Sequence, residues 1–341
     1  MKKNRLNIIL IAICGVVMLL FTMVADGPMV LLEALKSAKP VYLICAGLCM
    51  VLYWILEAST FHSVCRGINS SISYKDCFST SMVGQLFNCI TPFASGGQPM
   101  QAYRLVKCGM PLGQASCALL AKFIIYQLVL TFYSLVVIFF KLKFFLAEVS
   151  GFALLILLGF TINLIVMFLI VGIGFFPKIT TKFLIAISNL LCKIKIVKNG
   201  EALNKKIITE AEKFYENFAI IKANPKRFIL PSLITVVQLT AFFTVPYFVC
   251  LSLSVNHVSL LTIICAAAFV LLISSFVPLP GGAGGAEGGF YLFFGMFFVQ
   301  SGILSVAIVL WRILTFYLPI VAGMCFSRVS AKKSITSPEC V

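Results

Sequence analysis

The chain has 341 residues, of which 61% are hydrophobic and only 11% are charged, with a formal net charge of +16. A soluble domain carries roughly 25% charged residues, so this composition excludes a water-soluble globular protein. The sequence predicts an all-α, polytopic integral membrane protein with lipid around most of its surface.

Eight apolar segments are predicted to span the membrane. A spanning helix needs about 20 apolar residues, because backbone groups in lipid must form their hydrogen bonds within the helix. The first segment follows several basic residues, but its apolar run is too long for a cleaved signal peptide, so we expect a retained span. In chain order the segments are Leu6–Ala25, Val41–Leu56, Ala115–Phe140, Gly151–Phe176, Phe228–Leu253, Val258–Pro278, Phe290–Val299 and Ile303–Phe326.

The distribution of charge predicts the orientation. Lys178–Arg227 holds ten lysines and one arginine against four glutamates, a net charge of +7 (11 − 4). Basic segments mark the cytoplasmic side and are attracted to the anionic inner leaflet. We therefore predict a multi-pass cell-membrane protein with this segment and both termini cytoplasmic, and with Lys141–Glu148 external. The aromatic–basic interleaving typical of nucleic-acid binding does not occur, so nucleic acid is not an expected partner.

This orientation requires residues 78–107 to cross the membrane an even number of times. Their prolines and glycines favour a re-entrant hairpin. The predicted organisation is a first transmembrane half at 1–176 that includes this hairpin, and a basic amphipathic linker at 177–227. A second half at 228–328 follows, with a broken crossing near 278–300, and then a tail at 329–341. The linker is expected to form two surface helices, Pro177–Lys195 and Glu201–Lys222.

Two Gly/Pro-rich breaks stand at corresponding places in the two halves. Such interruptions are a sequence pointer to a transporter's binding site. Glycines after a proline free backbone N–H groups that attract anions, and charged residues in apolar segments are usually functional. The candidate lipid-binding residues are Asn88, Pro92, Gly96, Gly97, Gln98 and the following Arg104, then Pro280, Gly281, Gly282, Gly284, Glu287 and the following Arg312.

These features also have structural interpretations. The glycines could allow close helix packing, and Glu287 with Arg312 could be an ion pair that holds two segments together. Lys122, near the start of a span, is expected to snorkel to the cytoplasmic face. Glu57 and His62 follow a span and are expected at the membrane interface.

Cysteine usage gives no sign of a metal or disulfide framework. The 13 cysteines are scattered singly, most of them within apolar segments, and no CxxC pair or Cys/His cluster is present. Small packing residues in helices explain them. We expect no metal, no cofactor and no catalytic residues.

The two breaks together resemble the lysylphosphatidylglycerol synthase transmembrane family. This family comprises the flippase-like membrane domain of the multiple peptide resistance factor and its stand-alone relatives. The resemblance spans roughly residues 5–328, and the second break is its more specific part. One departure is Lys122–Gln127, where many relatives carry an acidic or arginine-bearing stretch, so the choice of lipid could differ.

The resemblance implies movement of a lipid between leaflets. The lipid would be an anionic or aminoacylated phospholipid, phosphatidylglycerol or its lysyl form in particular, or a polyprenyl-linked lipid. On this hypothesis the Gly-rich breaks hold the phosphate, and Arg104 and Arg312 neutralise it. Glu287 orients an arginine or engages a cationic headgroup.

Two alternatives stay open. One is a phosphatidylglycerol lysyltransferase, as the family label suggests, and the other is a lipid-binding scaffold that transports nothing. A transferase domain needs about 100–200 residues of soluble chain, whereas the longest soluble stretch, the linker, has about fifty, so we expect no catalytic domain. The sequence does not specify which lipid is bound, the direction of its movement or the energy source for that movement. It also leaves the oligomeric state open, and a homo-oligomer is one of the alternatives.

Overall fold

A computed structural model describes residue 36 and residues 38–69, 71–148, 151–193, 200–275, 277–298 and 301–327. The described part is all-α, which confirms the predicted fold class. Its long helices are α3 (Pro40–Ile68), α6 (Leu112–Glu148), α7 (Phe152–Phe175), α8 (Pro177–Lys193), α9 (Gly200–Ala223) and α10 (Ile229–Ser252). The shorter ones are α4 (Tyr74–Ile90), α5 (Gly97–Lys107), α11 (Leu260–Ser274), α12 (Gly285–Phe294), α13 (Ser301–Arg312) and α14 (Leu318–Ser327).

Five described stretches are long and apolar enough to cross a membrane. They are Pro40–Ile68, Leu112–Ala147, Leu158–Phe175, Pro225–Ser252 and Gly302–Ser327, and each coincides with a predicted span. Large apolar side chains such as Leu48, Phe132 and Leu233 are exposed on their outer faces, as lipid contact requires. The predicted first span at 6–25 and the tail at 329–341 lie outside the described residues.

At each break the chain reverses direction, so that the two short helices on either side of it form a hairpin. After α4 a short 3-10 turn, η1 (Pro92–Ala94), leads into α5, and after α11 a similar turn, η3 (Pro280–Gly282), leads into α12. Each first helix begins with a serine cap. The Ser73 hydroxyl accepts from the backbone N–H of Asp76 at 3.2 Å, and Ser259 caps α11 in the same way. Helices α4 and α5 pack against each other as a hairpin that includes the segment 78–107.

The second hairpin corrects the sequence prediction. Val258–Pro278 and Phe290–Val299 were expected to be two crossings, with a broken crossing around 278–300. Helices α11 and α12 have only 15 and 10 residues, too few to span a bilayer, and they pack against each other. The rings of Phe269 and Phe293 stack with centroids 5.5 Å apart. The chain therefore returns to the end from which α11 started, and this segment is a second helical hairpin.

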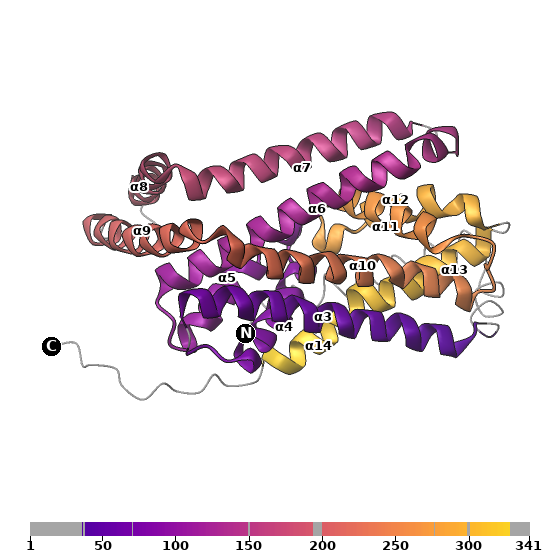
Figure 1. The fold of residues 1–341 in the computed structure, drawn as a ribbon, viewed down its shortest axis with the longest axis horizontal. Coiled ribbons are helices and arrows are strands. Elements are labelled where there is room, and N and C mark those ends of the chain that lie inside the picture. Colours follow the sequence, from indigo (N-terminus) through magenta and orange to yellow (C-terminus); the bar gives the residue numbers. More distant parts are fainter. Residues whose placement is uncertain are drawn as a thin grey trace.

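The two hairpins enter from opposite ends of the molecule. The rings of His62 and Tyr74 are 5.7 Å apart, which places the start of α4 beside the end of α3. The backbone N–H of Lys39 donates to the Ser252 carbonyl at 2.9 Å, which places the start of α3 beside the end of α10. Figure 1 shows α4 and α5 towards the end that carries α8 and α9, and α11 and α12 at the other end.

The halves are related by inversion. Helix α3, the first hairpin and α6 run in directions opposite to those of α10, the second hairpin and α13–α14 (Figure 1). Helix α3 packs along α10, α4 packs on α14, and α11 packs on α6 in the corresponding contact. The prolines at 92 and 280, 188 residues apart (280 − 92), are each followed by two residues with positive φ. Inverted repeats of this kind are common in transporters.

The last helix contains an irregular turn. Residues Ile313–Tyr317 form a π-helical turn, η5, between α13 and α14. Such turns take up one extra residue and occur frequently at functional sites. Farther along, Gly323 lies so close to α4 that an added Cβ would be 2.7 Å from the Met82 carbonyl oxygen. A small residue is therefore required where α14 crosses α4.

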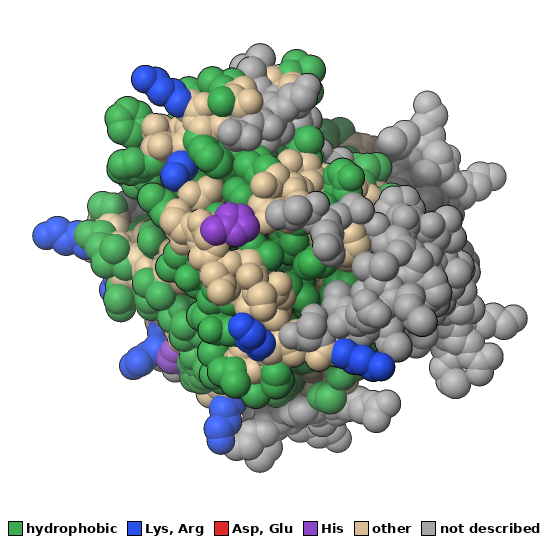
Figure 2. All heavy atoms as spheres, turned by 90° about the vertical axis from the view of Figure 1, so that its right-hand side faces the viewer, with side chains coloured by type: hydrophobic (Ala, Val, Ile, Leu, Met, Phe, Trp, Pro, Cys, Tyr) green, Lys and Arg blue, Asp and Glu red, His purple; other side chains and the backbone are tan. Residues whose placement is uncertain are grey.

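Figure 2 views the end opposite α8 and α9. The described surface there is mostly hydrophobic, with scattered basic side chains and histidine, and no Asp or Glu side chain appears among the coloured atoms. The described residues His257 and Lys141 belong to this end, after α10 and late in α6 respectively. At the other end the linker forms helices α8 and α9, whose bounds are close to those of the two predicted surface helices.

Candidate functional site

The tips of the two hairpins meet inside the body. Turn η1 contacts η3, and α4 also contacts η3, so the two Gly/Pro-rich breaks lie against each other. A cavity of about 780 Å³ lies at this junction, lined by Asn88 and Ala94 from one break and by Gly281 from the other. A smaller cavity of about 190 Å³ adjoins it and shares these three residues.

Arg312 joins the last helix to the second break. Its Nε donates to Glu287 Oε1 at 2.6 Å, and its Nη1 donates to the Gly281 carbonyl at 3.1 Å. The other carboxylate oxygen of Glu287 accepts from the Gly284 N–H at 2.7 Å. Because Arg312 is only 5% exposed, these contacts are what make its buried charge tolerable. Glu287 thus orients the arginine and caps α12 at the same time.

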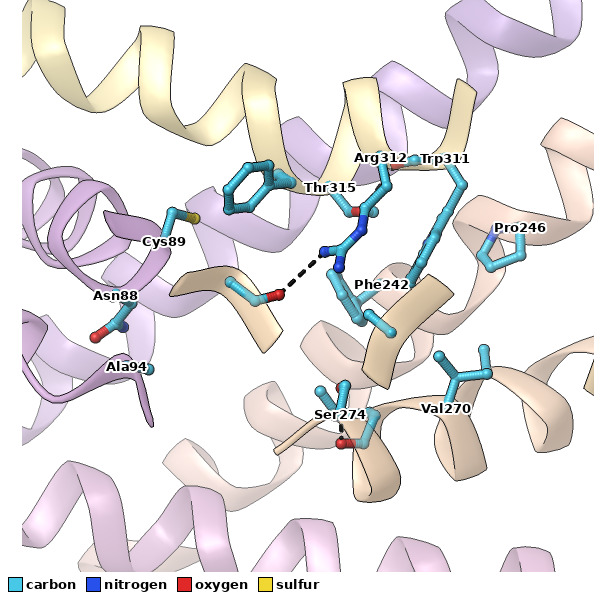
Figure 3. A pocket seen from close by; sticks show the side chains of 15 residues that line it. Asn88, Cys89, Ala94, Phe242, Pro246, Val270, Ser274, Trp311, Arg312 and Thr315 are labelled. Carbon is cyan, nitrogen blue, oxygen red and sulfur yellow. Dashed lines mark hydrogen bonds between the residues drawn. The ribbon is translucent and has the colours of Figure 1, made fainter. Parts of the chain in front are cut away.

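The guanidinium is also enclosed by aromatic rings. Its central carbon lies 5.3 Å from the ring centre of Trp311 and 5.4 Å from that of Phe316. Figure 3 shows the Arg312 side chain reaching from its helix into the smaller cavity, with Val270 and Ser274 of α11 on the opposite side. A polar group that enters this cavity meets a cation whose direction is already fixed.

Backbone geometry shapes the second break. Gly281 and Gly282 both have φ of +62°, a left-handed conformation that glycine adopts without strain. An added Cβ on Gly281 would run into the Phe316 ring. Pro280, which begins the turn, is buried. Glycine therefore lets this turn form without strain, and at position 281 it is also required by the closeness of the Phe316 ring.

The first break uses different residues for the same turn. Phe93 and Ala94 adopt φ of 53° and 52°, which is uncommon for residues with side chains. The Thr91 hydroxyl accepts from the Gly96 N–H at 2.8 Å and donates to the Phe87 carbonyl at 2.6 Å. These bonds close the loop that Pro92 begins.

The remaining candidates of this break lie at the start of α5. Gly97 is buried against the side chain of Asn88, so closely that a Cβ there would overlap the carboxamide. Gln98 is exposed and lines the larger cavity, as does Asn88. Among the sequence candidates, these two and Gly281, Gly282 and Arg312 line the cavities.

Arg104 is placed away from the cavities. Its Nη2 donates to the Ser79 hydroxyl on α4 at 2.6 Å, within the first hairpin. It lines neither cavity. Closeness in sequence to the break suggested a place beside Arg312, but the direction of α5 carries Arg104 back along α4. Its contact ties the two arms of the hairpin together.

Sequence reasoning missed a second ion pair in the cavity. Lys122 Nζ lies 2.6 Å from Glu57 Oε1, and the side chains are only 15% and 9% exposed. The Gln85 Nε2 donates to the other Glu57 oxygen at 2.6 Å, and Lys122 also lies over the Phe61 ring. The expectations that Lys122 snorkels and that Glu57 sits at the interface are therefore wrong. Neither residue carries a local signal of this pairing, because they lie on α3 and α6.

The fold and site define a class of protein: an all-α membrane-embedded protein with inverted halves and, between two broken hairpins, a cavity lined by both polar and apolar side chains. Residues 7–323 match the family described as "Lysylphosphatidylglycerol synthase TM region". The chain belongs to this family.

Relatives with nearly full-length similarity come from archaea. The chain is 25% identical to a UPF0104 membrane protein of Archaeoglobus fulgidus over 307 residues, which covers 89% of this chain and 90% of the relative. It is 24% identical to a UPF0104 membrane protein of Methanocaldococcus jannaschii, with 86% of each chain covered. A third such protein, from Methanothermobacter thermautotrophicus, is 24% identical, with 91% of each chain covered.

Proposed function

We propose that this protein moves a lipid between the leaflets of the cell membrane, with the headgroup passing through the cavity between the hairpin tips. The observation that carries the proposal is the meeting of two oppositely inserted, broken hairpins at one cavity beside Arg312, whose lining includes polar as well as apolar side chains. Irregular backbone at membrane depth is tolerated where it lines such a cavity. In transporters the binding site lies at the interface between inverted repeats.

The arrangement suggests how the lipid phosphate would be held. Arg312 offers a fixed guanidinium, and the start of α12 offers backbone N–H groups. Glu287 would keep both its bond to the Gly284 N–H and its bond to Arg312, so it would hold the tip in shape and the guanidinium in place beside a phosphate. Arg104, which lines neither cavity, would act through the hairpin and not on the phosphate.

The proposed orientation rests on charge. Residues 178–227, which include most of α8 and all of α9, carry the net charge of +7, and both termini would lie on the same cytoplasmic side. The basic faces would contact the anionic inner leaflet. The first hairpin would then open towards the cytoplasm and the second towards the outside. Phosphatidylglycerol and its lysyl form are the first lipids to test, because the family description names lysylphosphatidylglycerol.

The experiment is lipid transfer by the purified protein in vesicles, followed with a headgroup-labelled phosphatidylglycerol. We expect Arg312→Gln and Glu287→Gln each to reduce the transfer rate at least tenfold. Both variants are also melted, because a buried ion pair can be purely structural. Lys213→Gln is the matched control, since it removes the same kind of charge from the exposed Lys213–Glu210 pair.

The outcomes separate the alternatives. If the double variant Glu287→Gln with Arg312→Gln recovers both transfer and melting temperature, the pair is structural and the proposed phosphate site is wrong. Normal melting with no transfer by the wild-type protein would favour a lipid-binding scaffold. Formation of an aminoacylated lipid by the same preparation, supplied with charged tRNA, would favour the transferase.

A further inference from the structure

The larger cavity is lined by many carboxamides. Five of the seven glutamines in the chain line it, together with two asparagines: Gln85, Gln98, Gln101, Gln127, Gln238, Asn88 and Asn163. Six hydroxyl-bearing side chains join them: Tyr53, Thr60, Tyr126, Thr235, Ser274 and Ser275. Several of them already bond within the protein, as Gln85 does to Glu57 and as Ser274 and Ser275 do to the Leu271 carbonyl. Polar groups are costly to bury in a membrane protein without partners, so the lining groups that lack such bonds indicate a polar occupant.

This lining has no net charge. Its two charged residues, Glu57 and Lys122, lie 2.6 Å apart and neutralise each other. A cationic headgroup would need a surplus of acidic groups, and a phosphate would need a surplus of basic ones. The available guanidinium, that of Arg312, is in the adjoining smaller cavity. The larger cavity is therefore suited to the uncharged part of a headgroup.

Carboxamides and hydroxyls match each other chemically. A carboxamide offers two N–H donors and an oxygen acceptor on one planar group, and a hydroxyl both donates and accepts. An ammonium group only donates and a phosphate dianion only accepts, so neither would use both the donors and the acceptor of a carboxamide that has no partner in the protein. Phe93, Phe123 and Tyr126 add apolar faces against which C–H groups can pack. Such a mixture is suited to a polyol.

The Gln101 side chain has hydrogen-bonding groups that the protein does not use. It is only 5% exposed and lines the cavity, and its carboxamide has no hydrogen bond to any residue that the structure describes. Gly84 on α4 leaves room for it, because a Cβ there would overlap the Gln101 amide. Gln98 lies one turn earlier on α5, on the same side. By contrast, Gln127 is already held by the Asn163 carbonyl at 3.2 Å.

We infer that the larger cavity receives an uncharged, polyhydroxylated headgroup, a glycerol or a sugar, and that Gln101 determines this specificity. The inference rests on the proposed function only in taking a lipid as the ligand. The phosphate of a glycerophospholipid would lie beside Arg312, and the hydroxyls would reach Gln98 and Gln101. A neutral glycolipid would use the same carboxamides without the phosphate contact.

The test is equilibrium binding to the purified protein in phosphatidylcholine nanodiscs, read by native mass spectrometry. Four dioctanoyl probes form two matched pairs: phosphatidylglycerol against phosphatidic acid, and glucosyl-diacylglycerol against diacylglycerol. We expect the hydroxylated member of at least one pair to bind at least tenfold more tightly. If only phosphatidylglycerol is preferred over its partner, the headgroup bound is glycerol. If only glucosyl-diacylglycerol is preferred over its partner, the headgroup bound is a sugar. Lysyl-phosphatidylglycerol should bind no more tightly than phosphatidylglycerol.

Gln101→Leu should abolish the tenfold preference and leave phosphatidic acid binding unchanged. Gln114→Leu is the matched control, because Gln114 bonds to Asn69 and does not line the cavity. If Gln101→Leu does not fold, Gln98→Leu at the exposed neighbouring position should reduce the same preference.

Equal binding within both pairs, tightest binding of the lysyl lipid, or an unchanged preference in the folded variants would overturn the inference. Binding is measured without transport, so the two proposals fail separately. Selective binding without transfer contradicts translocation alone, whereas transfer without selective binding contradicts only the inference about the headgroup.

Discussion

Replacing Lys122 by methionine tests whether the missed ion pair stabilises the helix bundle. The substitution keeps the length of the side chain but leaves the buried Glu57 carboxylate without its counter-ion. Removing one partner of a buried pair costs about 3–5 kcal/mol. Gln85 still donates to Glu57 at 2.6 Å, and hydrogen bonds to charged groups contribute about 1.5–3 kcal/mol. We therefore expect a loss near the lower limit, about 3 kcal/mol.

A thermal melt of the purified protein measures this loss. For a chain of this size about 2 °C of melting temperature corresponds to each kcal/mol, so we expect a decrease of roughly 6 °C. Lys143→Met is the matched control: it makes the same change at an exposed position near the other end of α6 and should have almost no effect. The double variant Glu57→Gln with Lys122→Met should melt well above Lys122→Met alone.

Two results would refute this reasoning. If Lys122→Met melts like the wild type, the carboxylate does not depend on the lysine. If the double variant melts no higher than the single one, the two residues are not coupled, because a pair in direct contact shows an interaction energy of about 0.5–3 kcal/mol in such a cycle.

The remaining predictions concern the tight first break and the orientation. Gly97→Ala should lower the melting temperature by an amount that corresponds to about 1–3 kcal/mol, because its methyl group overlaps the Asn88 carboxamide. Gly288→Ala, a helical position with open space around it, should be neutral or stabilising, and equal losses in both variants would contradict the packing argument. A single cysteine at Gly200, in a cysteine-free background, should react with an impermeant maleimide only after the cells are opened; labelling of intact cells would reverse the proposed orientation.

The long helices could be predicted from the sequence because membrane length and apolar composition are local properties. The second hairpin could not. The apolar runs on either side of Pro280 have the composition of crossings, and it is the packing of α11 on α12, with Phe269 against Phe293, that shows that the chain turns back. A half-length helix enclosed by protein is as apolar as one that spans the bilayer.

The candidate site was predicted in part for a similar reason. Glu287 and Arg312 stood out because charge is rare in apolar segments, and the structure brings them to 2.6 Å. Lys122 and Glu57 are also charged residues in or beside apolar segments. Each lies near the end of a predicted span, however, where an interfacial position is the simpler explanation. Their pairing depends on how α3 packs against α6, which is not encoded within either segment.

The π-helical turn in the last helix sets the angle around the helix axis between Arg312 and Gly323, which face different neighbours. Arg312 must face the second hairpin, whereas Gly323 must face α4. Eleven residues of regular α-helix would point these two positions within about 20° of each other. The extra residue taken up by η5 separates them by roughly a quarter of a turn. A one-residue deletion between positions 313 and 317 would therefore leave the composition of the helix intact but turn Gly323 away from α4, so natural length variation should be excluded from this short stretch.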